Sequence, residues 1–283
     1  MALLLATVLL GGCSALRLGY NQAPDLAFWW LDGYADFDDN QSLRTRDGLA
    51  AWFAWHRRTQ LPNYAALLVR AQTEIVADMP AARMCTWWGE LYERFDVAID
   101  RAVPDIAEVM LSFKPEQLRH MERQHAKKNA ECRSEYLDGD AAERAAQNLK
   151  RTIDRAETLY GRLDDVQRAR IGRALAASPF DAEAWFVERR RRQQDALQLL
   201  RRLIAEGASR EQAQAAVRAY ALRVKRSPNE AYRQYQERLT QFNCGFSAEL
   251  HNATTPAQRQ TAVDKLKGWE RDLRALVAQG NGG

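Results

Sequence analysis

The stretch Leu163-Asp164-Asp165-Val166-Gln167-Arg168 has the pattern of a helix start. The carboxylate of Asp164 can accept a hydrogen bond from a backbone N–H group of the first turn, which has no partner inside the helix. The side chain of Gln167 can accept one from the backbone N–H of Asp164. Apolar residues then recur at helical spacing, so the stretch predicts a well-capped helix.

Two more stretches follow the same plan, Phe113-Lys114-Pro115-Glu116-Gln117-Leu118 and Thr254-Thr255-Pro256-Ala257-Gln258-Arg259. Each has a cap position, two turn-starting residues and a Gln in the first turn. Thr255 is a good N-cap, and proline suits a first turn because the hydrogen bond that it lacks has no helical partner there. The stretches are either three well-capped helices or copies of an internal repeat.

The rest of the chain has the same periodicity. From about residue 24 onward apolar residues recur at helical spacing, and alternating strand patterns are nearly absent. This predicts an all-α fold, a multi-helix bundle of long antiparallel helices, with one helical domain over 24–278 and a disordered tail at 279–283. Proline, glycine and asparagine predict helix breaks near 61–63, 79–80, 103–104, 114–115, 138–139, 161, 178–179, 207, 227–228 and 255–256.

The composition limits the class of protein. The chain has 283 residues, of which 46% are hydrophobic and 28% charged, so it can bury a core and is not a polytopic membrane protein. The net charge of +4 suits anionic lipid headgroups or acidic proteins without requiring either.

The N-terminus has the pattern of a bacterial lipoprotein signal. An apolar run, Ala2 to Leu10, leads into Leu10-Gly11-Gly12-Cys13, although no Lys or Arg precedes it. We expect a signal peptide at 1–12, lipidation of Cys13 by fatty acyl chains such as palmitate, and a linker at 13–23. The run is too short to span a bilayer, so acyl chains would anchor the protein. Ser14 resembles the outer-membrane sorting pattern and places the body in the periplasm. The alternative is an ordinary cleaved signal peptide.

Three cysteines remain in the mature chain, Cys85, Cys132 and Cys244. They lie far apart without CxxC spacing, which excludes zinc-site and thioredoxin-type patterns. In an oxidising compartment we expect one disulfide among them, with the pair left open.

Trp29, Trp30 and Tyr34 follow the predicted anchor closely. Amphipathic aromatic side chains prefer the membrane interface, so these residues could rest on the bilayer. The favoured interpretation is that they belong to the core and pair with Trp52 and Phe53.

His56 lies on the apolar side of its predicted helix, where a hydrogen-bonded core histidine is expected. The other histidines, His120, His125 and His251, are scattered, and no HExxH or equivalent pattern occurs, so no metal site is expected.

Catalytic patterns are missing from the sequence. There is no GxSxG elbow and no Gly-rich phosphate loop. We therefore expect no enzyme and no cofactor. An unrecognised catalytic site would need a buried cleft where His56 meets an acid such as Asp32 or Asp36.

Four consecutive arginines, Arg189, Arg190, Arg191 and Arg192, follow Glu188. They could bind anionic lipid, lipopolysaccharide phosphates or acidic segments of another protein. The favoured alternative is a solvated helix with ion pairs between residues four apart. Nucleic acid is not an expected partner of an exported protein.

Several features resemble a family of uncharacterised proteobacterial lipoproteins: Cys13, Tyr20-Asn21, the segment Trp30 to Tyr34, His56-Arg57, the turn Leu61-Pro62-x-Tyr64 and the Gln-Arg helix start at Gln258-Arg259. The resemblance implies an envelope lipoprotein of helical fold and brings no established activity. The Gln-containing helix starts also resemble the twin Leu-Thr-x-x-Gln signature of Spy/CpxP-like periplasmic helical chaperones, without the Leu-Thr pair itself.

These observations predict a non-enzymatic envelope lipoprotein that binds proteins or lipids at the periplasmic face of the outer membrane, as a chaperone-like protein or an assembly factor. The possible binding surface includes Trp29, Trp30, Tyr34, His56, Arg57 and Arg189 to Arg192. The alternative is a structural tether for one partner complex, and an enzyme with an unrecognised site comes third.

Overall fold

The computed structural model describes residues 15–280, and over that range it is all α-helical. The helices are α1 (Ala15–Ala35), α2 (Asp39–Glu74), α3 (Ala81–Leu111), α4 (Pro115–Tyr136), α5 (Ala141–Tyr160), α6 (Asp165–Ala176), α7 (Ala182–Glu206), α8 (Arg210–Lys225), α9 (Glu230–Asn252) and α10 (Pro256–Gly280). The predicted all-α fold is confirmed.

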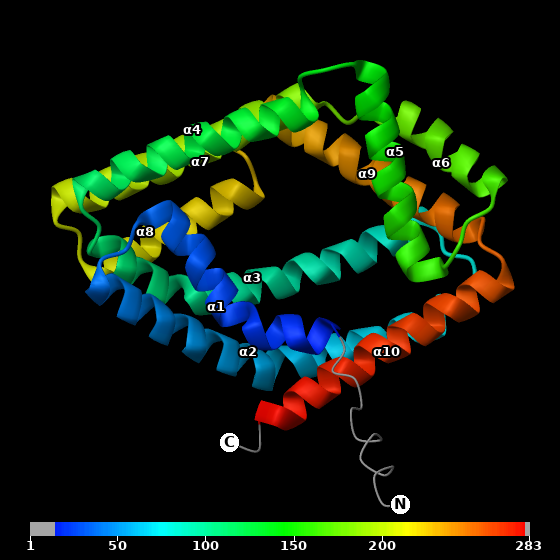
Figure 1. Ribbon diagram of the computed structural model, residues 1–283, viewed down its shortest axis with the longest axis horizontal. Helices are drawn as coiled ribbons and strands as arrows, with labels where there is room; N and C mark the ends of the chain where they lie inside the picture. Colours follow the sequence, from blue (N-terminus) through cyan, green and yellow to red (C-terminus); the bar gives the residue numbers. More distant parts are fainter. Residues whose placement is uncertain (1–14, 281–283) are drawn as a thin grey trace, which may run out of the picture.

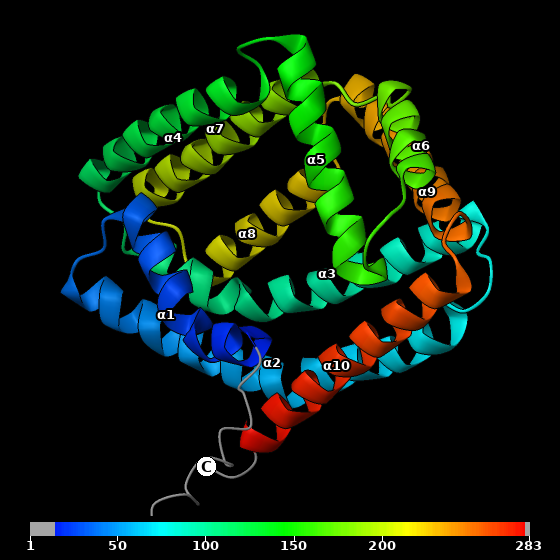
Figure 2. The ribbon, with the colours of Figure 1, turned by 45° about the vertical axis from the view of Figure 1, so that its right-hand side comes forward.

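The long helices pack in antiparallel pairs that outline a four-sided frame (Figure 1). One side is α2 with α10, the most extensively packed pair, and another is α4 with α7. The helix α3 crosses between these sides and packs against α2, α8 and α9. Figure 2 shows the same pairs after rotation, with α1 lying over α2. This arrangement gives helices such as α1 and α3 long faces that no neighbour covers.

The core is divided among several places in the frame. Buried apolar side chains in the described chain form separate clusters, one around Ile75, Tyr160 and Leu266 and another around Val103, Leu199 and Val217. Stability therefore comes from packing at several places, each of which joins three or more helices.

Two helix starts meet at one junction of the frame. The side chains of Gln41 in α2 and Gln117 in α4 exchange hydrogen bonds of 3.1 and 2.7 Å. Each amide also donates to a backbone carbonyl beside the partner helix, Gln41 to Ser112 at 2.8 Å and Gln117 to Asp36 at 2.9 Å. Gln41 and Gln117 also cap their own helices, so one pair of side chains ties two helix starts together.

A second junction has the same bonding. Gln167 of α6 and Gln258 of α10 exchange hydrogen bonds of 2.8 and 2.9 Å, and they donate to the carbonyls of Ala253 and Arg162. The predicted helix starts at 113–118, 163–168 and 254–259 are confirmed. The copies at Asp38 to Gln41 and Ser209 to Gln212 were not predicted.

Two predicted helix breaks are wrong. Pro62 lies inside α2 and Pro104 inside α3. Proline in a helix removes one hydrogen bond, but the preceding residues, Leu61 and Val103, are almost completely buried. Their packing offsets the cost and keeps the helices continuous. The other eight predicted breaks fall between helices.

The ends of the described chain differ from the expected linker and tail. The expected linker at 13–23 is helical from Ala15 onward, and α10 continues through Gly280 into the expected tail at 279–283. Cys13, the signal peptide at 1–12 and residues 281–283 lie outside the described residues. None of the described helices has the length and apolar character needed to cross a membrane.

A disulfide joins Cys85 of α3 to Cys244 of α9, with Cα atoms 5.3 Å apart. This settles which of the three cysteines pair. Cys132 in α4 is a free, half-buried thiol.

Candidate functional site

His56 is a buried, hydrogen-bonded histidine, as predicted. The Tyr20 hydroxyl lies 2.9 Å from its Nδ1 atom, and the imidazole stacks on Trp52 with ring centroids 4.8 Å apart. Burial lowers the pKa of His56. Its hydrogen-bond partner is Tyr20 and neither Asp32 nor Asp36.

The two acids make contacts elsewhere. Asp32 accepts a hydrogen bond from the backbone N–H of Phe37, and Asp36 lies 3.9 Å from His120. Arg57 donates to Asn21 at 2.8 Å beside the His56 cluster. The side chains of this cluster therefore fasten α1 to α2.

The expectation that Trp29 and Trp30 are core residues is wrong. They are 62% and 64% exposed. Trp52 and Phe53, the expected partners, pack with Tyr20 and His56 instead. The physical reason is helix geometry: successive residues turn by about 100°, and Phe28 occupies the buried face of α1, so Trp29 and Trp30 point away from it.

Tyr34, the third aromatic residue of this segment, is half-buried. Its ring lies 5.0 Å from Trp30 and 5.8 Å from His125 of α4. Tyr34 thus connects the exposed tryptophans of α1 with the packed contact between α1 and α4.

The arginine run divides into paired and unpaired side chains. Arg191 and Arg192 contact the buried carboxylate of Glu188 at 2.8 and 3.1 Å. Burial alone would raise the pKa of Glu188, but hydrogen bonds from these arginines and from Ser227 lower it overall. The predicted ion pairs between residues four apart are confirmed for both arginines, since Arg192 pairs with Glu188 and Arg191 also lies 3.3 Å from Asp195.

The other two arginines lie toward α4. Arg189 donates to Asn129 at 3.1 Å. Arg190 is exposed and makes no hydrogen bond or ion pair with the described part of the chain. Arg190 is therefore the member of the run that is open to a partner.

A groove of about 690 Å³ runs between α4 and α7. Its sides carry Asn129, Arg133, Arg190, Gln193 and Arg201 among others. Arg201 pairs with Glu122 across the groove, and Arg133 lies 3.3 Å from Asp138. The groove is lined by both polar and apolar side chains, and two pairs of its polar side chains bond each other, Asn129 with Gln193 and Glu122 with Arg201.

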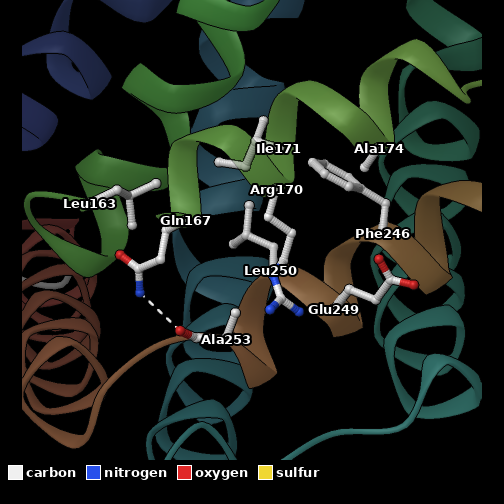
Figure 3. Close-up of a pocket in the computed structure, with 9 residues that line it drawn as sticks. All are labelled: Leu163, Gln167, Arg170, Ile171, Ala174, Phe246, Glu249, Leu250 and Ala253. Carbon is white, nitrogen blue, oxygen red and sulfur yellow. Dashed lines mark hydrogen bonds between the residues drawn. The ribbon is translucent and has the colours of Figure 1, made fainter. Parts of the chain in front are cut away.

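A second pocket lies between α6 and α9. Figure 3 shows its lining, with Ile171 and Phe246 near each other and Gln167 bonded to the Ala253 carbonyl. Its volume of about 10 Å³ holds at most a water molecule. This pocket is therefore a small gap in the packing of α6 against α9.

The described residues contain no group of three or more His, Cys, Asp or Glu side chains that could hold a metal ion.

A long exposed apolar feature lies on α3. We define the α3 stripe as the exposed side chains of Trp88, Tyr92, Phe95, Ile99 and Ile106. At about 100° per residue they fall within roughly 40° of one line along the helix. Tyr92 and Phe95 are each 59% exposed. The stripe is thus a row of large apolar side chains in contact with solvent.

Packed helices lie on both sides of the α3 stripe. On one side Trp52 of α2 donates to the Ala98 carbonyl at 2.9 Å. On the other side Val103 packs against α7 and α8, and Cys85 is bonded to α9. Neighbouring helices therefore border the stripe without covering it.

Sequence reasoning missed this stripe. Its signal is present, because apolar residues recur at helical spacing from Trp88 to Ile106, but the same spacing is expected of a core helix. Only the exposure of the side chains identifies it as a surface.

The chain belongs to DUF6279, a family of unknown function, whose pattern matches residues 33–222. The matched range covers the Tyr34 segment, His56, the α3 stripe and the arginine run. The resemblance to an uncharacterised family is thereby confirmed. No curated protein and no solved structure matches the chain, and a relation to Spy/CpxP-like chaperones is not shown.

Proposed function

We propose that this protein is a lipid-anchored, non-enzymatic protein of the cell envelope that binds apolar segments of other proteins through the α3 stripe. The exposure of Trp88, Tyr92 and Phe95 on one helix face is the observation that carries the proposal.

The composition of the stripe favours a protein partner. Contiguous exposed apolar patches are uncommon on soluble proteins and mark interaction sites. Aromatic side chains are enriched where partners bind most tightly. From Trp88 to Ile106 the stripe extends about 27 Å at 1.5 Å per residue, enough for several turns of a bound amphipathic helix or for an extended segment.

The rim of the stripe is charged. Asp96 pairs with Lys225, and Asp100 lies 3.9 Å from Arg218. A polar rim around an apolar centre is the usual anatomy of a binding surface. Arg190, which lies in the groove between α4 and α7 and has no ion-pair partner in the described chain, offers a separate site for acidic segments of a bound protein.

The membrane location rests on the sequence. The pattern ending in Cys13 supports an acyl anchor, and Ser14 supports the outer membrane, with the body in the periplasm. Under this proposal the anchor keeps the α3 stripe near newly exported envelope proteins.

The test compares two double variants of the full chain. Tyr92→Ser/Phe95→Ser removes the centre of the α3 stripe, and Val166→Ser/Phe180→Ser removes exposed apolar side chains of α6 and of the segment before α7. We expect wild type and the second variant to suppress the aggregation of citrate synthase diluted from guanidinium chloride, measured by light scattering. The first variant should lose most of this effect.

Two results would contradict the proposal. One is a wild-type chain that fails to suppress aggregation at several-fold excess. The other is an equal loss in both variants. Crosslinking in intact cells distinguishes the chaperone-like protein from the alternative, a structural tether. One dominant stoichiometric partner favours the tether, whereas many weak partners favour the chaperone-like protein.

A further inference from the structure

A second uncovered apolar face lies on α1. We define the α1 outer face as the exposed side chains of Leu18, Leu26, Trp29 and Trp30. At about 100° per residue these residues span an arc of roughly 120°, opposite the side that carries buried Phe28 and Ala35. The helix is therefore amphipathic, with its apolar outer face turned away from the molecule.

The rest of this arc is also compatible with an apolar environment. Across the described helix the arc holds otherwise Ala15, Gly19, Gln22 and Gly33, and no charged side chain. Asp25 lies at its edge and pairs with Arg46 at 3.5 Å. The arc therefore carries no charge, and Gln22 is its one polar side chain.

The position of α1 points to a bilayer as the occupant. The helix begins at Ala15, two residues after Cys13. At up to about 3.5 Å per residue, the predicted acyl anchor lies within roughly 10 Å of the start of the helix. A short tether of this kind gives the outer face a high effective concentration at the membrane.

Figure 1 shows α1 at the surface of the molecule. The helix α1 lies on the near face of the molecule and runs from α10 toward α4, with no other helix in front of it. From Leu18 to Trp30 the outer face extends about 18 Å along the helix. Because its four side chains are exposed, none of the described helices covers this face.

We propose that the α1 outer face docks on the phospholipid bilayer, with the helix parallel to the surface and with Trp29 and Trp30 at the level of the headgroups. Tryptophan prefers this interface because its ring is apolar and its N–H is polar. The membrane contact then has two parts, the N-terminal anchor and α1, which together fix the orientation of the body. The inference rests on the anchor of the proposed function and is independent of the α3 stripe.

The test uses tryptophan fluorescence of the lipidated full chain in vesicles of phosphatidylethanolamine and phosphatidylglycerol. Lipids with brominated acyl chains quench tryptophans that reach the interface. The variant Trp29→Phe/Trp30→Phe keeps the face aromatic and removes its fluorophores. Trp88→Phe is the matched control, since Trp88 is also exposed but lies on the α3 stripe.

We expect quenching in wild type and in Trp88→Phe, and loss of most of it in Trp29→Phe/Trp30→Phe. Equal quenching in the two variants would overturn the proposal, and so would a chain that does not sediment with the vesicles. In a second variant, Trp30→Glu, the new charge should reduce quenching of Trp29 while circular dichroism remains helical. Unchanged quenching in this variant would also count against docking.

The two proposals fail separately. Trp29→Phe/Trp30→Phe should suppress aggregation as wild type does, and Tyr92→Ser/Phe95→Ser should be quenched as wild type is. If client binding fails while quenching persists, the α3 proposal is wrong and membrane docking stands.

Discussion

His251 in α9 is completely buried and fully hydrogen-bonded. Its Nε2 atom lies 2.8 Å from the Ala77 carbonyl, and its Nδ1 atom lies 3.0 Å from the Tyr160 hydroxyl. A carbonyl can only accept, so Nε2 carries the proton and Nδ1 accepts from Tyr160. This neutral histidine joins α5, α9 and the segment after α2.

The protonation of buried histidines predicts a loss of stability on mild acidification. Burial lowers the pKa values of His251, His56 and His125 in the folded protein. The unfolded chain, with a histidine pKa of about 6.5, therefore binds protons at higher pH than the folded chain. The free energy of unfolding should fall as pH drops below about 6.5, until the folded histidines also titrate. Urea unfolding at pH 7 and pH 5 measures this.

The variant His251→Gln isolates one of these groups. It should cost about 1–3 kcal/mol at pH 7, because a buried hydroxyl or carbonyl loses its partner. The loss between pH 7 and pH 5 should be smaller than in wild type, since one titrating group is gone. Parallel pH curves for the two proteins would show that His251 does not contribute.

At the scale of the element, the paired glutamines hold helix starts together by hydrogen bonds. Gln117 of α4 caps its own helix, bonds Gln41 and donates to the carbonyls of Ala35 and Asp36. Gln117→Leu would leave several of these buried groups without partners, so we expect a loss of about 3 kcal/mol in the free energy of unfolding.

Gln212 is the matched control for Gln117. It caps α8 through Ser209 in the same way but is exposed and has no partner glutamine among the described residues. Gln212→Leu should cost less than about 1 kcal/mol in urea unfolding. Equal losses in the two variants would mean that the junction adds nothing beyond the cap. The double variant Gln41→Leu/Gln117→Leu should cost less than the sum of the single variants.

Local chemistry explains which elements the sequence could predict. A cap and its Gln are three residues apart, so the starts of α4, α6 and α10 are visible in the chain. The meeting of Gln41 with Gln117 depends on the tertiary arrangement and has no local signal. The same holds for Pro62 and Pro104, where packing of distant helices overrides the local preference for a break.

The candidate surfaces were only partly predictable for the same reason. Trp29 and Trp30 could be selected by residue type, but their exposure depends on which face of α1 meets α2 and α4. The α3 stripe has the periodicity of a core helix. It stays exposed because the frame places no helix over it, which the sequence of α3 alone does not determine.

At the scale of the whole molecule, the frame is held by several apolar clusters and by the disulfide between α3 and α9. Buried apolar side chains of the described helices form four clusters, two of them linked through Met110 and the other two through Leu250, so the core is spread over the frame. The Cys85–Cys244 disulfide fastens α3, which crosses the frame, to α9 near the other end of the chain. It also keeps the base of the α3 stripe at a fixed distance from α9.

The disulfide should therefore be a major source of stability. It spans a sequence separation of 159 residues, and closing so long a loop restricts the unfolded chain by about 5 kcal/mol in the chain-entropy model, with measured values more often about 2–4 kcal/mol. Cys85→Ser/Cys244→Ser should lose this amount in denaturant unfolding, and dithiothreitol should destabilise wild type but not the variant. Cys132→Ser is the control and should respond to dithiothreitol as wild type does, because its thiol is free. If dithiothreitol leaves wild-type unfolding unchanged, the cross-link does not support the frame, and helix packing alone must hold α3 against α9.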